Sequence, residues 1–158
     1  MSTLRRILVC VLVAGSSLAL ASCGSSSVTT LTGDWTNNAP TTVPGATTQR
    51  VLHLDADGTG SYRFIASGAC SGTIAYVGFS WTVTESSGGT GRALRLTTEP
   101  TCSGRISCTT GDGSDCNTVA VVTVGSCQYT LSADASTLGL TACFGAVMGT
   151  DTFTRGAR

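Results

Sequence analysis

Cysteine offers the widest range of chemistry in this chain, and it occurs eight times among 158 residues. A thiolate can act as a nucleophile, enter a disulfide or bind zinc. Protein zinc sites commonly use Cys-x-x-Cys pairs, or cysteine together with histidine. This chain has no Cys-x-x-Cys pair and its only histidine is His53, so we expect no metal site. Disulfides and a modified thiol remain as the expected chemistry.

The segment before Cys23 has the layout of an export signal. Arg5 and Arg6 precede the uncharged, largely apolar run 7–20. That run is shorter than the roughly 20 residues that a membrane-spanning helix needs. A short apolar run between a basic pair and small residues is typical of a secretory signal peptide.

Leu20-Ala21-Ser22-Cys23 resembles the lipobox of bacterial lipoproteins. The resemblance implies cleavage after a signal peptide of residues 1–22, with Cys23 as the first mature residue, carrying acyl chains such as palmitate. Each buried CH₂ contributes about 0.8 kcal/mol, and more than one chain gives stable attachment. We therefore expect an exported protein anchored to a bacterial membrane; the alternative is an ordinary secreted protein. Gly24 stands where an Asp would favour inner-membrane retention, which favours the outer membrane in a Gram-negative cell.

An even number of cysteines remains once Cys23 is assigned to lipid and Cys10 is lost with the leader. An exported chain of this kind is expected to form disulfides. Six cysteines allow about 15 arrangements, so the sequence leaves the connectivity open. The six are Cys70, Cys102, Cys108, Cys116, Cys127 and Cys143.

Residues that could support catalysis or calcium binding are few. A nucleophile–histidine–acid site would depend on His53, and no serine lies in a Gly-x-Ser-x-Gly motif. Asp55 and Asp57 lack the third oxygen ligand and the distant Glu of an EF-hand loop. We therefore expect His53 to be an exposed strand residue and the two aspartates to belong to a hairpin turn. Neither an enzyme nor a bound cofactor is predicted.

The charge balance argues against a polyanionic partner. All nine basic residues are arginine, and there are nine acidic residues. Loss of Arg5 and Arg6 with the leader leaves a net charge of −2. Nucleic-acid-binding domains usually carry a basic patch, so we expect no nucleic-acid partner.

Apolar and polar residues alternate over much of 31–158, which predicts one domain of β-strands. Residues 24–30 (GSSSVTT) are predicted to be a flexible tether, so that 23–30 links the lipid to the domain. Loops are predicted at 37–49 and 100–117. The predicted strands are 31–36, 50–54, 61–66, 71–77, 79–84, 94–97, 119–124, 127–131, 138–140 and 152–154.

Short turns between the strands, with no helical period, are typical of an antiparallel barrel or sandwich. The turn at Asp134 would bring Cys127 close to Cys143 on facing strands, a bridge worth about 3 kcal/mol in the chain-entropy model. Cys108 with Cys116, and Cys70 with Cys102, are then the remaining pairs that we expect.

Several short motifs resemble those of lipocalins and lipocalin-like bacterial domains. They are Gly33-Asp34-Trp35, the turn Asp55-Ala56-Asp57-Gly58-Thr59, the strand pair around Tyr129 and Leu140, and the terminal Phe153-Thr154-Arg155. The resemblance implies an antiparallel up-and-down barrel of about eight strands, in which Arg155 packs across Trp35 at the closed end. The cysteine-rich segment 102–116 lies outside the family pattern. A disulfide-tied β-sandwich is the alternative.

Aromatic residues at alternating positions could fill the core or line a ligand cavity, because eight-stranded barrels can hold one small ligand. We expect non-catalytic binding of a small apolar or amphipathic molecule at the cell envelope. The alternative is a structural or protein-binding lipoprotein, such as an inhibitor or assembly factor, that uses its loops. The candidate cavity residues are Tyr62, Phe64, Phe79, Trp81 and Tyr129.

Overall fold

Ten β-strands make up the regular structure of the computed structural model, which describes residues 31–39, 41–85, 92–118, 124–143 and 150–156. Within these ranges Leu31 alone has helical geometry. The strands are β1 (Gly33–Ala39), β2 (Ala46–Leu54), β3 (Thr59–Gly68), β4 (Cys70–Glu85), β5 (Arg92–Leu96), β6 (Thr101–Cys108), β7 (Gly113–Asp115), β8 (Gly125–Leu131), β9 (Thr137–Thr141) and β10 (Thr150–Arg155).

Eight of these strands close into an antiparallel barrel, which confirms the predicted fold. Strands β1 to β4 pair in sequence, β5 continues from β4, and β8, β9 and β10 follow. The barrel closes where Trp35 and Thr36 of β1 pair with Arg155 and Thr154 of β10. Strands β6 and β7 are inserted between β5 and β8 and lie outside the closed barrel.

The turn between β2 and β3 shows how the local sequence favours the hairpin. Gly58 has a φ of 85°, a conformation that costs glycine little. The Asp57 carboxylate accepts hydrogen bonds from the backbone N–H and the hydroxyl of Thr59, at 2.9 and 2.7 Å. These hydrogen bonds hold the predicted hairpin turn together.

Strand β4 runs through a segment for which the sequence predicts two strands. The register with β3 shifts at Gly60 and Ser61, which pair with Phe79 and Val77. Gly78, with a φ of 79°, is the extra residue of this bulge. A Cβ atom on Gly60 would lie 2.6 Å from the Phe79 ring, so the ring packs directly over the glycine backbone.

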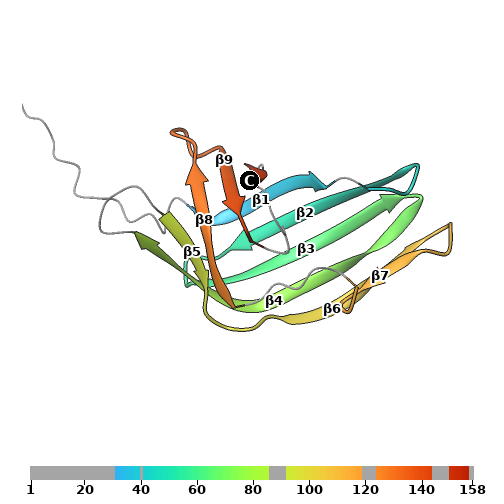
Figure 1. The fold of residues 1–158 in the computed structure, drawn as a ribbon, viewed down its shortest axis with the longest axis horizontal. Helices are drawn as coiled ribbons and strands as arrows, with labels where there is room; N and C mark the ends of the chain where they lie inside the picture. Colours follow the sequence, from blue (N-terminus) through green and yellow to red (C-terminus); the bar gives the residue numbers. More distant parts are fainter. Residues whose placement is uncertain (1–30, 40, 86–91, 119–123, 144–149, 157–158) are drawn as a thin grey trace, which may run out of the picture.

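One side of the molecule is much longer than the other. In Figure 1, β2, β3, β4, β6 and β7 run far beyond the short strands β5, β8 and β9. The long edge of β4 makes this possible, because its first half pairs with β6 and its last residues pair with β5. The prediction of one loop over 100–117 is wrong, since pairing with β4 orders a polar segment as β6 and its partner β7.

The loop predicted over 37–49 is also shorter in the structure, because β1 extends to Ala39 and β2 begins at Ala46. Residues 119–123 of a further predicted strand lie outside the described residues.

Large apolar side chains fill the interior of the barrel. Trp35, Tyr62, Phe79 and Phe153 are completely buried there. Leucines are the most frequent residues in the remainder of this core, and those within strands come from β2, β5 and β9. A smaller cluster at the far end contains Ala46, Ala66 and Cys70.

Three disulfides join the six cysteines of the described residues, and one has the predicted partners. Cys127 pairs with Cys143, with Cα atoms 5.3 Å apart. The other two predicted pairs are wrong: the structure joins Cys70 to Cys108 and Cys102 to Cys116. The β4–β6 register explains this, because it places Cys70 directly opposite Cys108 and Cys102 opposite Tyr76.

The leader, Cys23 and the tether 24–30 lie outside the described residues. Across the part of the chain that is described, no helix has the length and apolar character needed to cross a bilayer.

Candidate functional site

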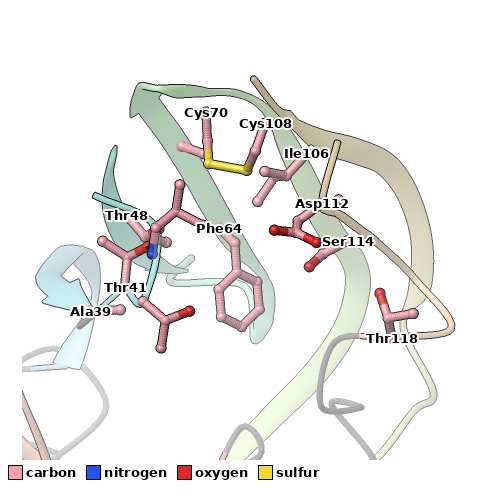
Figure 2. Close-up of a pocket in the computed structure, with 14 residues that line it drawn as sticks. Ala39, Thr41, Thr48, Phe64, Cys70, Ile106, Cys108, Asp112, Ser114 and Thr118 are labelled. Carbon is pink, nitrogen blue, oxygen red and sulfur yellow. Dashed lines mark hydrogen bonds between the residues drawn. A yellow bond between two sulfur atoms is a disulfide. The ribbon is translucent and has the colours of Figure 1, made fainter. Parts of the chain in front are cut away.

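A pocket of about 460 Å³ lies where the long strands extend beyond the barrel. Figure 2 shows the Phe64 ring projecting into it, with the Cys70–Cys108 disulfide at one side and the oxygens of Asp112 and Ser114 on another wall. We call it the mouth pocket. Its lining residues are Ala39, Thr41, Thr42, Val43, Thr48, Phe64, Ala66, Cys70, Ile106, Cys108, Asp112, Gly113, Ser114 and Thr118.

The lining of the mouth pocket is amphipathic. Phe64, Ile106 and the disulfide give apolar surface, while threonine and serine residues give hydroxyl groups. Asp112 is the only charged residue among the lining residues, and its carboxylate accepts a hydrogen bond from the Thr110 hydroxyl at 3.1 Å. The pocket therefore offers apolar contact together with several hydrogen-bonding groups, and no basic residue.

Three sets of contacts hold the walls of the mouth pocket in place. The disulfide ties the start of β4 to the end of β6. The backbone N–H of Thr109 donates to the Ala69 carbonyl at 2.9 Å, next to that bridge. In the β1–β2 connection, the Val43 N–H donates to the Thr41 hydroxyl and the Val43 carbonyl accepts from Ala46.

A set of polar side chains lies inside the barrel, next to the mouth pocket along the strands. The guanidinium of Arg50 donates to the Asp151 carboxylate through both terminal nitrogens, at 2.8 and 3.0 Å. The side chains of Arg50 and Asp151 are 14% and 20% exposed. We use the name polar layer for Asn37, Arg50, Tyr62, Tyr76 and Asp151.

The strand registers place this polar layer directly beneath the mouth pocket. Arg50 is opposite Phe64 of the pocket lining. Side chains alternate between the two faces of a strand, so Thr48 is the next inward-facing residue after Arg50, and Ala39 follows Asn37 in the same way. Both Thr48 and Ala39 line the pocket.

The two tyrosines of the polar layer are buried, at 0% exposure for Tyr62 and 2% for Tyr76. Burial raises the pKa of Tyr62 far above its usual value of 10, an effect that the neighbouring Arg50 partly opposes. Burial also raises the pKa of Tyr76. Both hydroxyls therefore stay protonated at neutral pH and can donate hydrogen bonds.

Three buried atoms of the polar layer have no hydrogen-bond partner among the described residues. They are Asn37 Oδ1, Arg50 Nε and the Tyr76 hydroxyl. Leaving a buried polar group without a partner costs about 1 to 3 kcal/mol. Such a group can be satisfied by water or by another polar molecule that binds there.

The five aromatic residues named as cavity candidates divide into two groups. Phe64 lines the mouth pocket and packs edge-on against Tyr62, with ring centroids 5.0 Å apart. Tyr62, Phe79, Trp81 and Tyr129 lie in the packed core of the barrel, each at most 4% exposed.

Trp35 and Arg155 meet at the opposite end of the barrel. The Arg155 guanidinium carbon lies 4.2 Å from the Trp35 ring centroid, a cation–π arrangement. Arg155 also donates to the carbonyls of Thr32 and Ala135, both at 2.8 Å. The Trp35 indole donates to the Leu31 carbonyl at 2.7 Å, so this end is covered by hydrogen-bonded chain.

His53 lies on the outer face of β2 between two carboxylates. Its Nδ1 is 2.6 Å from Asp34 and its Nε2 is 2.9 Å from Asp55. The hydrogen bond to Asp34 is the main reason that the pKa of His53 is raised above 6.5. Both hydrogen-bond partners of the His53 ring are carboxylates, and no group of three side chains among the described residues is suited to hold a metal ion.

Of the polar layer, only Tyr62 was among the candidate residues expected from the sequence, although the strand pattern also contains a signal for two others. Arg50 is in phase with the buried Leu52 and Leu54, and Asp151 is in phase with Phe153. A charged residue in the phase of the core residues indicates an inward-facing charge that needs a partner.

Comparison of the chain with protein-family models, curated proteins and solved structures finds no match in any of the three.

Proposed function

We propose that this protein is a cell-envelope lipoprotein that binds a small amphipathic molecule in the mouth pocket, without converting it chemically. The observation that carries the proposal is the pocket itself, which combines the Phe64 and Ile106 side chains with a wall of hydroxyl groups. Small-molecule sites are typically concave and apolar, with a few placed polar groups.

Binding is assigned to the mouth and not to the centre of the barrel, because the centre is filled. Trp35, Leu52, Tyr62, Phe79 and Phe153 are all completely buried and leave the barrel packed with side chains. This assignment refines the expectation of a ligand held inside the barrel.

Lipid attachment through Cys23 completes the proposal and accounts for the export signal. With Cys23 acylated and Cys10 removed with the leader, six cysteines remain, and all six form the three disulfides. Disulfides persist in oxidising compartments, which supports an envelope location.

The pocket can be tested by filling it. Ile106→Trp places a large ring in the lining, while Ser107→Trp adds the same ring to the neighbouring exposed residue on the opposite face of β6. We expect the parent protein and Ser107→Trp to bind N-phenyl-1-naphthylamine, and Ile106→Trp to bind it at least tenfold more weakly. Fluorescence titration measures this. Equal binding by all three proteins, or none by the parent, would overturn the proposal.

A further inference from the structure

The polar layer lies one step along the strands below the residues that line the mouth pocket, and we treat it as the floor of the pocket although it is not part of the lining itself. Arg50 and Asp151 face into the barrel, yet 14% and 20% of their side chains remain exposed. The closed end of the barrel is covered by Arg155 and Trp35, so we assign this exposure to the opposite end. The registers of Arg50 with Phe64 and of Asn37 with Arg50 place that opposite end at the mouth pocket.

The charge of this floor is already balanced. The Asp151 carboxylate occupies both terminal nitrogens of the Arg50 guanidinium. An incoming anion would have to compete with Asp151, and it would also meet Asp112 in the lining. An incoming cation would be attracted by Asp112 in the lining, but it would approach the Arg50 guanidinium at the level of the polar layer. At that level each charged form therefore meets a largely buried group of like charge, Asp151 for an anion and Arg50 for a cation.

The buried atoms without a partner include both kinds of hydrogen-bonding group. Arg50 Nε donates, Asn37 Oδ1 accepts, and the Tyr76 hydroxyl can do either. Tyr76 is 2% exposed, and it interacts electrostatically with Tyr62, which also contacts Arg50. The three groups thus belong to one cluster on the inner face of β1, β2 and β4.

We infer that the mouth pocket selects an amphipathic molecule whose polar group is uncharged and both donates and accepts hydrogen bonds, and that Asn37, Arg50 and Tyr76 receive this group. An alcohol, an amide or a sugar head has this chemistry, whereas a fatty-acid carboxylate or an alkylammonium does not. The apolar chain would lie against Phe64 and Ile106. This inference rests on the proposed binding function and specifies its ligand class.

Three probes with the same eight-carbon chain separate the head-group chemistries: 1-octanol, octanoate and octylammonium. Each is used to displace N-phenyl-1-naphthylamine from the full mature protein at pH 7. We expect 1-octanol to bind at least tenfold more tightly than either charged probe. Tighter binding of octanoate or octylammonium, or equal binding of all three, overturns the inference.

Tyr76→Phe tests the floor without disturbing the packing. The hydroxyl has no protein partner to lose, so the variant should melt at no lower temperature than the parent. Its affinity for 1-octanol should fall about five- to tenfold, the usual effect of one hydrogen bond. Its affinity for the two charged probes should change less than twofold. An unchanged affinity for 1-octanol in a folded variant counts against the inference.

The two proposals fail in different ways. If the three probes bind alike in the parent and all are lost in Ile106→Trp, the pocket binds ligands but does not select the head group. If neither the probes nor the naphthylamine bind to the parent, the binding function itself fails, and the inference fails with it.

Discussion

The histidine between two carboxylates is the clearest pH-dependent feature at the scale of single residues. Asp34 and His53 are cross-strand partners on the outer face of β1 and β2, and Asp55 follows two residues later. Both ring nitrogens donate to carboxylates when the imidazole is protonated, so these contacts favour the charged form. All three side chains are more than a third exposed, and solvent therefore reduces the energetic effect to a fraction of that in a buried pair.

The raised pKa of His53 has a definite consequence for stability. The contribution is fully present below the ordinary pKa of 6.5, and it is lost as the pH rises through the higher pKa of the folded state. As the pH rises from 6.5 through the pKa of His53 in the folded state, we expect the free energy of unfolding to decrease. The decrease should be larger in the parent than in His53→Gln by a few tenths of a kcal/mol. Urea denaturation at several pH values measures the difference.

Because the chain has a single histidine, its titration can be followed directly by proton NMR. We expect a midpoint above 6.5 in the parent and a lower midpoint in Asp34→Asn. A midpoint at or below 6.5 in the parent would contradict the hydrogen bonds described for the ring.

At the scale of elements, the β6–β7 hairpin owes its position to β4 and to one disulfide. Cys70–Cys108 closes a separation of 38 residues and forms part of the pocket wall. Cys127–Cys143 closes 16 residues and lies in the core of the barrel, away from the pocket. The first bridge therefore forms part of the pocket wall and the second part of the barrel core, although both stabilise the fold.

Removing each bridge separately should distinguish these roles. In the chain-entropy model, replacing both cysteines by alanine costs about 4 kcal/mol for Cys70–Cys108 and about 3 kcal/mol for Cys127–Cys143. We expect only the first double variant to lose binding of N-phenyl-1-naphthylamine under conditions in which both are folded. Urea denaturation and fluorescence titration provide the two measurements. Equal loss of binding in both variants would contradict the assignment of the wall.

The sequence predicts the barrel better than it predicts the pocket. Alternation is strong in β3 and β8, where packing on one face agrees with local preference, and these strands are found where expected. Residues of β6 and β7 include few large apolar side chains, and 107–115 is rich in Gly, Ser, Thr and Asp. Their strand structure depends on pairing with β4, which no local pattern indicates. Phe64 was recognised as a candidate, whereas Ile106 and Asp112 lie on that unpredicted hairpin.

At the scale of the whole molecule, the proposed anchor determines where the protein is found. Cys23→Ser removes the thiol that would accept lipid. We expect this variant to appear in the soluble envelope or culture fraction, while the parent stays with the membrane and partitions into detergent. Cys10→Ser, inside the proposed leader, is the matched control and should behave as the parent does. Membrane attachment of Cys23→Ser would contradict the lipoprotein proposal.

Under the proposed anchor at Cys23, the position of the hydrogen-bonded cap formed by Leu31, Trp35 and Arg155 limits how the domain can face the membrane. The described chain enters the barrel at this cap, and β2 spans nine residues, about 30 Å, between the cap and the mouth. A tether of residues 23–30 reaches at most about 28 Å even when fully extended. With Cys23 in the bilayer as proposed, the tether is too short for the domain to stand upright with its mouth on the lipid surface, so the anchor favours the cap as the end nearer the membrane. Ligand exchange would then occur with the surrounding compartment, or with a carrier approaching from it, and not with the protein's own membrane.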